Sequence, residues 1–182
     1  MKNGTVQDGK SVLSIGAVVA GLLLSSVAVA QQRQKYLFNA LVPAKYTEQH
    51  VIEVGDFPGH QIRVAALNTK YSDEAPAFDG VKVTESSGWI SSDYIGGSGR
   101  FMQYLVLQMA NGDKIYEQAE GLAQTVVGPD GSRKTTYWTV TYLKGGSGKF
   151  SSIRGVLRGS GATDFKTGPT NNTVEGEYWF EK

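Results

Sequence analysis

The sequence contains no cysteine and only two histidines, His50 and His60. Without cysteine the chain has no disulfide, no zinc–thiolate site, no thiol nucleophile and no lipid-anchored cysteine. Asp56 lies between the two histidines and could join them in binding a metal, but the spacing matches no known metal signature. We therefore predict no metal site and no cofactor, and we interpret both histidines as rim residues that titrate near neutral pH.

An excess of charge of either sign is also lacking. The chain has 18 Lys and Arg against 17 Asp and Glu, a formal net charge of +1. Lys2, Lys10 and Asp8 are the charged residues of segment 1–30, so residues 31–182 carry equal numbers of basic and acidic side chains. A balanced domain offers no electrostatic footprint for nucleic acid, and we expect no nucleic-acid partner.

Two catalytic motifs are absent as well. There is no Gly-x-Ser-x-Gly elbow and no Ser, His and Asp order typical of hydrolases. Two glycine runs, at 96–99 and 145–148, superficially resemble phosphate-binding loops, but neither is followed by Lys-Ser or Lys-Thr. Both are better interpreted as hairpin turns, each followed by a basic residue and phenylalanine.

What the N-terminus does contain is a secretory signal. Lys2 and Lys10 precede an uncharged apolar stretch at 12–30, which ends with Ala28-Val29-Ala30. A positive start, an apolar centre and small residues at the end predict cleavage after residue 30. The alternative is a retained anchor, because about 20 apolar residues suffice to span a bilayer. Cleavage predicts a periplasmic or secreted protein with no membrane association.

The remaining chain alternates like a β protein. Residues 31–49 are mixed and predict a flexible or partly helical lead-in, with a short helix around Tyr36–Leu41 ending before Pro43. Residues 50–182 follow period two and are punctuated by turn sequences such as Asn111-Gly112. The predicted strands are 50–56, 60–71, 80–94, 99–110, 114–127, 133–144, 152–162 and 173–181. We expect one all-β domain, an eight-stranded antiparallel barrel of calycin-like type.

The alternation assigns faces to some strands. We expect Trp138, Val140 and Tyr142 to face the barrel interior, together with Tyr178 of the last strand. Arg154 and Arg158 are then outside, opposite Glu175 and Glu177. The inward aromatic residues are candidates for contact with a bound ligand, and they are Trp138, Tyr142 and Tyr178.

One predicted strand is apolar on both faces. The run Phe101–Met109 has few polar residues on either face. A strand that is apolar on both faces needs the barrel interior on one face and another part of the protein packed on the other. That cover is either the 31–49 segment or a partner subunit. We favour the partner, so we expect a homo-oligomer.

Polar candidates for catalysis are few. Tyr116 and Glu120 share one face of the strand at 114–127, and Glu85 and Tyr104 lie on neighbouring strands. A carboxyl beside tyrosines in an apolar barrel would have a raised pKa and could act as a general acid or base. The alternative is that this face meets solvent, because the other face is smaller and more apolar, with Glu117 as its one charge.

A short motif resembles a known family. Leu143-Lys144-Gly145-Gly146-Ser147-Gly148-Lys149-Phe150, followed by Ile153-Arg154-Gly155, resembles a turn shared by allene oxide cyclases and dirigent proteins. The ending at 174–179 is similar to the last strand of small exported bacterial proteins with the same kind of barrel. The resemblance implies an eight-stranded barrel, often oligomeric, with a mostly apolar cavity. The catalytic residues of those families do not map onto this chain, so none is transferred.

Two functions are compatible with these patterns. The first is an exported barrel that binds a small hydrophobic molecule in its interior or acts through its surface. The second, implied by the resemblance, is a cofactor-independent isomerase or cyclase, which works by shaping a reactive substrate. The sequence leaves open whether the protein is an enzyme, and the interior of the barrel is what distinguishes the two.

Overall fold

The computed structural model describes residues 32–39, 45–72, 74–164 and 168–182. The chain divides into two units, Met1–Ala30 and Gln31–Lys182, and all the described residues belong to the second. The predicted signal segment therefore lies outside the described residues. Within the described ranges, no helix is long and apolar enough to cross a membrane.

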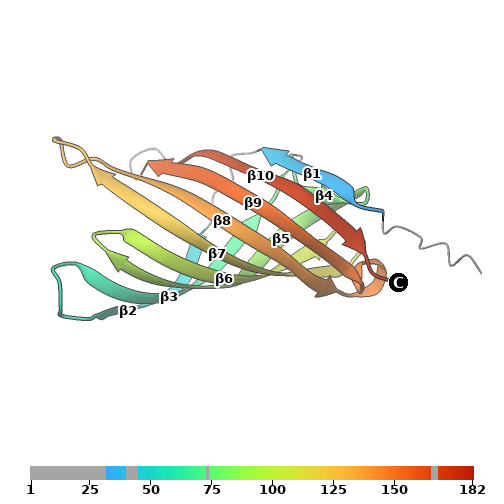
Figure 1. The fold of residues 1–182 in the computed structure, drawn as a ribbon, viewed down its shortest axis with the longest axis horizontal. Helices are drawn as coiled ribbons and strands as arrows, with labels where there is room; N and C mark the ends of the chain where they lie inside the picture. The colour runs from blue at the N-terminus through green and yellow to red at the C-terminus, as the bar shows by residue number, and fades with distance from the viewer. Residues whose placement is uncertain (1–31, 40–44, 73, 165–167) are drawn as a thin grey trace, which may run out of the picture. The chain divides into compact units, whose positions relative to one another are not determined.

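The second unit is built from antiparallel strands (Figure 1). The strands are β1 (Gln34–Asn39), β2 (Lys45–Glu53), β3 (His60–Lys70), β4 (Ala77–Phe78), β5 (Val81–Ile95), β6 (Ser98–Met109), β7 (Lys114–Val127), β8 (Arg133–Gly146), β9 (Ile153–Asp164) and β10 (Gly168–Phe180). A single 3-10 turn, η1 (Gly148–Phe150), follows β8. The strand order is β1-β10-β9-β8-β7-β6-β5-β3-β2, with β4 paired to β5.

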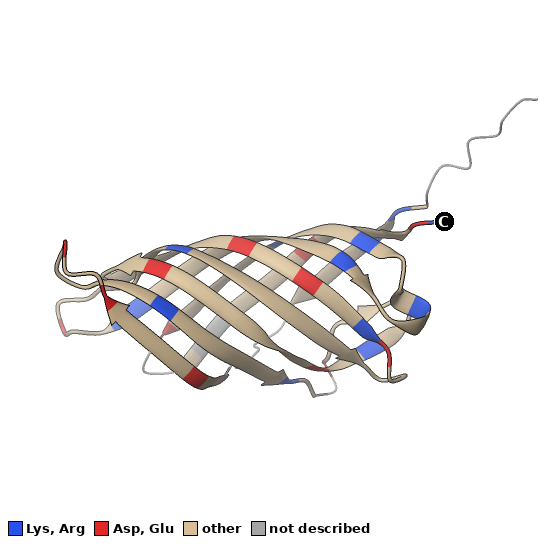
Figure 2. Cartoon of the chain, turned by 90° about the horizontal axis from the view of Figure 1, so that it is seen from below, with Lys and Arg blue, Asp and Glu red and all other residues tan. Residues whose placement is uncertain are grey.

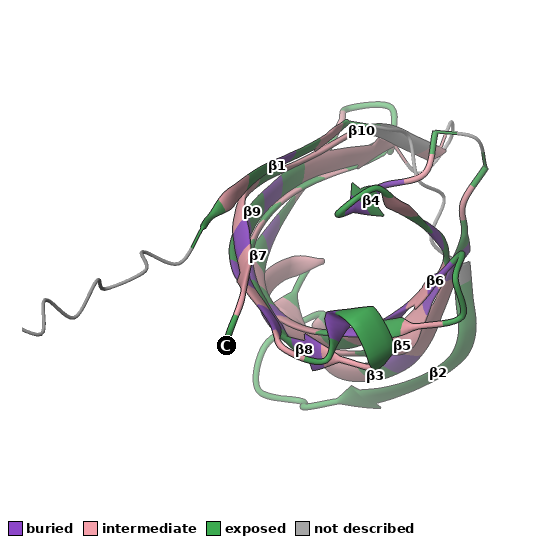
Figure 3. Cartoon of the chain, turned by 90° about the vertical axis from the view of Figure 1, so that its right-hand side faces the viewer, coloured by how far each residue is buried: buried purple, intermediate pink, exposed green. Residues whose placement is uncertain are grey.

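The predicted all-β antiparallel fold is confirmed, with two corrections. Residues 34–39 form strand β1, paired with β10, instead of the short helix expected there. The two-residue strand β4 was also not predicted, so ten strands replace eight. The hydrogen-bonded order of the described strands ends at β1 and β2, so the sheet curls around an interior without closing through backbone pairing (Figure 3).

Tight turns set the lengths of the long strands. Gly112 adopts a φ of 86° in the β6–β7 turn and Gly131 a φ of 76° in the β7–β8 turn. A side chain would be strained at these angles, which explains why glycine occupies both positions. Asn111 supports the first turn, because its side-chain oxygen accepts a hydrogen bond from the backbone N–H of Asp113 at 3.1 Å.

One end of the interior is packed solid. Phe78 of β4 stacks on Tyr36 of β1 with ring centroids 4.6 Å apart and meets the ring of Tyr178 edge-on at 5.3 Å. Figure 3 shows β4 inside the ring formed by the other strands. Phe150 of η1 and Leu143 of β8 complete this cluster and are almost fully buried. The glycine turn therefore places Phe150 in the packed end of the interior.

The rest of the inner face is more open and more polar. Inward side chains of β3, β5, β6 and β7 keep partial exposure there, among them Arg63, Tyr94, Gln103 and Glu117. Gly121 lies beneath the ring of Phe101. A side chain at this position would clash with the ring, because its Cβ would sit 2.5 Å from Cζ. The ring can therefore lie along the sheet instead of filling the interior.

The face assignment of β8 was wrong. Trp138, Val140 and Tyr142 point outward and are exposed, Trp138 by 52%, whereas Thr141 and Leu143 are buried inside. Both sets contain apolar groups, so alternation alone did not identify the inner one. The assignments of β9 and β10 were right: Leu157 and Tyr178 are buried inside, and Arg158 lies outside opposite Glu175.

Candidate functional site

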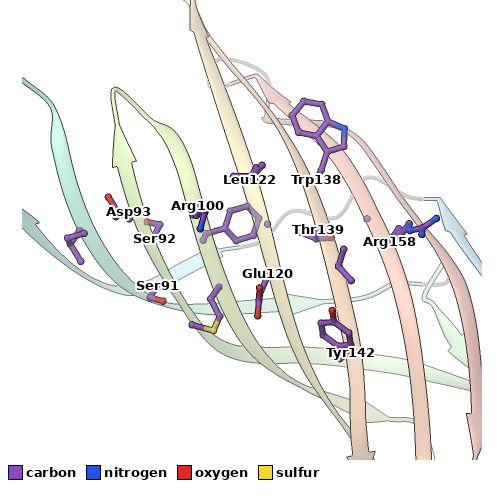
Figure 4. A pocket seen from close by; sticks show the side chains of 16 residues that line it. Ser91, Ser92, Asp93, Arg100, Glu120, Leu122, Trp138, Thr139, Tyr142 and Arg158 are labelled. Atoms are coloured by element: carbon purple, nitrogen blue, oxygen red, sulfur yellow. The ribbon is translucent and has the colours of Figure 1, made fainter. Parts of the chain in front are cut away.

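The outer face of the sheet carries a concavity of about 890 Å³. It extends over β5, β6, β7, β8 and β9, and Figure 4 shows its side chains. Its outward-facing lining residues are Ile62, Ser91, Asp93, Arg100, Met102, Glu120, Leu122, Trp138, Val140, Tyr142 and Arg158. Most of the apolar groups among them are exposed, so an apolar surface of some extent is presented to solvent on this face.

Strand pairing explains why these side chains gather. Met102, Glu120, Val140 and Arg158 are direct neighbours across β6, β7, β8 and β9. In the next row, Leu122 lies between Arg100 and Trp138 in the same way. Side chains directly opposite on antiparallel strands are about 5 Å apart, so each row forms a continuous strip.

Charge surrounds the apolar centre of the concavity. Arg100 on β6 and Arg158 on β9 are three strands apart, with Glu120 of β7 between them. Within the described part of the chain, neither guanidinium forms an ion pair with a carboxylate. Elsewhere basic and acidic residues are interspersed along the strands (Figure 2). The two arginines are therefore available to an anionic group bound in the concavity.

A second hollow of about 670 Å³ adjoins the first on the outer face. Trp89 of β5, Tyr104 of β6 and Gln118 of β7 are direct cross-strand neighbours in its lining, and Tyr116 and Lys144 contribute to it. Tyr142 continues that row into the first concavity. Together the hollows make one aromatic surface over the middle of the sheet.

His60 is held between two carboxylates at the edge of this region. Its Nδ1 lies 2.5 Å from Oδ1 of Asp56 and its Nε2 lies 2.8 Å from Oδ1 of Asp93. Hydrogen bonds that the His60 ring donates to Asp93 and Asp56 raise the pKa of His60 above 6.5, because both favour the imidazolium form. His50 is not nearby; it bonds to Glu48 instead. In the described ranges no group of three His, Cys, Asp or Glu is arranged to hold a metal ion.

The inner face holds a carboxyl, that of Glu117, which was not among the site residues predicted from the sequence. Glu117 of β7 points inward between Ile115 and Ala119, and burial raises its pKa from 4.5 to about 7. Burial also raises the pKa of Tyr71, which interacts with Glu117 and shares a 3.4 Å contact with Ser86 Oγ. The signal for Glu117 was present in the sequence, as the single charge on the apolar face of its strand.

Five of the other predicted site residues lie on the outer face. Glu120, Tyr104, Tyr116, Trp138 and Tyr142 all lie outside, where the structure brings them together around the two hollows. The inward orientation expected for Trp138 and Tyr142 was wrong, whereas Tyr116 and Glu120 lie on a solvent-exposed face, the alternative that the sequence left open.

The two remaining candidates are already engaged. Glu85 accepts a hydrogen bond from Asn68 Nδ2 at 2.5 Å. Tyr178 is in the packed core, where its hydroxyl donates to Gln34 Oε1 at 2.6 Å and accepts from the backbone N–H of Asp79 at 2.8 Å. Neither side chain lies at the concavity.

Comparison with known proteins adds little to what the structure itself shows. No family model matches the chain, and no curated protein is similar to it in sequence. One solved structure, that of a pterocarpan synthase dirigent protein, is similar to 93% of this chain and 100% of its own. The sequence identity is 14% and the TM-score is 0.41. The all-β architecture therefore stands on the strands themselves, and no activity is transferred.

Proposed function

We propose that the protein binds a small, largely apolar molecule bearing an anionic group in the outer concavity. The observation that carries the proposal is the pairing of exposed apolar side chains, such as Trp138 and Leu122, with the arginines Arg100 and Arg158. Ligand sites are concave and mostly apolar, with a few polar groups that fix orientation. The volume of about 890 Å³ lies within the range of such sites.

The proposed site differs from the one expected inside a barrel. Trp138 and Tyr142 remain the proposed contacts, but they act from the outer face. Burying an exposed leucine or tryptophan side chain under a ligand contributes about 1.5–3 kcal/mol. Apolar contact is therefore the main source of affinity, and a guanidinium–carboxylate contact contributes orientation and about a further 1.5–3 kcal/mol.

We also propose that the protein acts outside the cytoplasm after cleavage following Ala30. Support comes from the sequence of residues 1–30 alone. Intact-mass measurement of protein recovered from an exporting host is expected to give a chain that begins at Gln31. A chain that retains residues 1–30 would contradict export by cleavage.

A binding titration with dodecanoate tests the ligand proposal. Dodecanoate is expected to bind about tenfold more tightly than dodecanol, because only the former offers a carboxylate to the arginines. Arg100→Gln or Arg158→Gln is expected to remove that preference while leaving dodecanol binding unchanged.

The apolar contribution has a matched control. Leu122→Ser is expected to weaken binding of both probes about tenfold, because the side chain that covers them is lost. Leu37→Ser on β1 is the control, since Leu37 is also an exposed outer leucine, 67% against 54% for Leu122, and does not line the concavity. If each probe binds the wild type and Leu122→Ser with the same affinity, this site is excluded.

A second candidate function is general acid–base catalysis inside the sheet. Glu117 supports it, since a carboxyl with a pKa of about 7 exchanges protons at neutral pH. Arg63 adds a second polar group to the inner face, and its buried Nε has no hydrogen-bond partner among the described residues. A native mass spectrum of purified protein distinguishes the candidates. A co-purified molecule lost in Leu122→Ser supports the outer site, and one lost only in Glu117→Gln supports the interior.

A further inference from the structure

Strand β2 (Lys45–Glu53) is an open edge of the sheet, with a bulge between Tyr46 and Glu48. It pairs with β3 on one side, and in the described part of the chain no strand pairs with its other side. Its apolar residues are exposed on both faces of the sheet, with Ile52 exposed by 64% and Tyr46 by 54%. Figure 3 shows the strand in the colour of exposed residues. Natural sheets seldom leave such an edge open, because its backbone groups readily pair with another strand.

The backbone direction at this edge follows from one hydrogen bond. The N–H of Val54 donates to the carbonyl of His60 at 3.0 Å, so residue 54 belongs to a hydrogen-bonded pair with β3. Such pairs alternate along an antiparallel ladder. The N–H and C=O groups of Glu53, Val51 and Gln49 are therefore directed away from β3, towards the open edge.

The side chains of β2 match a second β2 strand in one register. Glu48 and His50 lie on the outer face and their side chains hydrogen-bond to each other at 2.9 Å. In an antiparallel pair centred on Gln49, Glu48 of each copy lies directly opposite His50 of the other. A pair centred on Glu48 or on His50 would instead place like residues together.

The central residue also has the backbone geometry that this register needs. Gln49 directs its N–H and C=O to the edge, so the two copies of Gln49 exchange both hydrogen bonds. The flanking Glu48–His50 pairs are then non-hydrogen-bonded pairs, in which opposite Cα atoms approach to about 4.5 Å. Opposite charges at that position, which are present when His50 is protonated, are favourable, and like charges are unfavourable.

We propose that β2 pairs antiparallel with β2 of a second copy of this chain, about a two-fold axis at Gln49. The pairing joins two sheets through their edges and covers Val51 and Ile52 with residues of the second copy. The edge adjoins the outer hollows, because Ile62 in the concavity is the cross-strand neighbour of Ile52 and Thr47 of β2 lines the second hollow. A two-fold contact of this kind is self-complementary and closes at two copies.

Sedimentation velocity of the purified protein over a range of concentrations tests the pairing. The wild type is expected to form a dimer. Gln49→Pro removes the central N–H, which β3 does not use, so the variant is expected to remain folded and become monomeric. His50→Glu places carboxylates opposite each other and is expected to weaken the dimer about tenfold or more.

The matched control exchanges the two charges. The double variant Glu48→His with His50→Glu restores opposite charges across the axis and is expected to recover the dimer. A folded monomer at every concentration, a trimer, or a dimer unaffected by Gln49→Pro and His50→Glu would overturn the proposal.

Hydrogen exchange separates this pairing from coverage by the chain's own N-terminal segment. The amides of Gln49, Val51 and Glu53 are expected to be protected in the wild-type dimer and to exchange quickly in the His50→Glu variant. Protection of the same amides in a monomer would mean that the chain covers its own edge, and it too would overturn the proposal.

Discussion

Strand β8 carries apolar side chains on both faces of the sheet, and the two faces differ in burial. Leu143, on the inner face, is 2% exposed and packs beside Phe150 and Ile153, whereas Tyr142 next to it is 41% exposed on the outer face. The inner face is covered by elements from elsewhere in the chain, namely β1, β4 and η1. No described element covers the outer one. An apolar face becomes core only where something closes over it, and the uncovered face is available to a ligand.

The largest expected effect comes from substituting neighbours on opposite faces of β8. Leu143→Ala is expected to reduce the free energy of unfolding by about 3 kcal/mol, because it leaves a cavity in a packed cluster. Tyr142→Ala is expected to change it by less than about 1 kcal/mol, because the side chain is exposed. Urea unfolding measures both, and equal losses would show that the outer face is buried in solution.

A smaller effect is expected from the buried carboxyl on the inner face. With a pKa of about 7 in the folded state against 4.5 for an ordinary glutamate, Glu117 binds its proton more tightly when the chain is folded. The contribution of Glu117 to stability is therefore complete below pH 4.5 and is lost as the pH rises from 4.5 to 7, by an amount on the order of 2–4 kcal/mol.

Thermal melts across that pH range measure this loss. Glu117→Gln is expected to remove the part of the pH dependence that Glu117 contributes. Glu120→Gln on the outer face of the same strand is the matched control and is expected to keep the wild-type pH dependence. An unchanged profile in Glu117→Gln would mean that the carboxyl is hydrated.

The smallest effect concerns His60 at the rim. Its raised pKa means that its contribution to stability is complete below pH 6.5 and is lost as the pH rises through the folded value. NMR titration of the imidazole is expected to give a pKa above 6.5 in the wild type and a lower value in Asp93→Asn. A value that does not change in that variant would contradict the hydrogen bond from Nε2 to Asp93.

Much of this fold could be predicted from the sequence, because the strands have clear ends. Turns such as Asn111-Gly112 fixed the boundaries of β6 and β7 to within a residue or so. Strand β1 was missed because six residues are too few for a clear period-two pattern. The strand is stabilised by a contact distant in sequence, the packing of Tyr36 on Phe78. Long-range contacts of this kind have no local signature.

The candidate site was predicted only as a set of residues. Trp138, Tyr142 and Glu120 do gather at one concavity, but they were divided between an inner ligand site and a catalytic face. The inner face of β8 carries threonines, which look like surface residues, and Thr141 is nevertheless buried. Only the covering elements distinguish the two faces. The edge at β2 likewise depends on strand order, which alternation does not give.

Methyl NMR with dodecanoate tests most directly whether the uncovered face is the binding surface. The account predicts that dodecanoate shifts the methyl signals of Leu122 and Val140, which line the outer concavity, and leaves those of Leu143 and Leu157 inside unchanged. Shifts confined to inward methyl groups, such as those of Leu107 and Ile115, would place the ligand in the interior and contradict the proposed function.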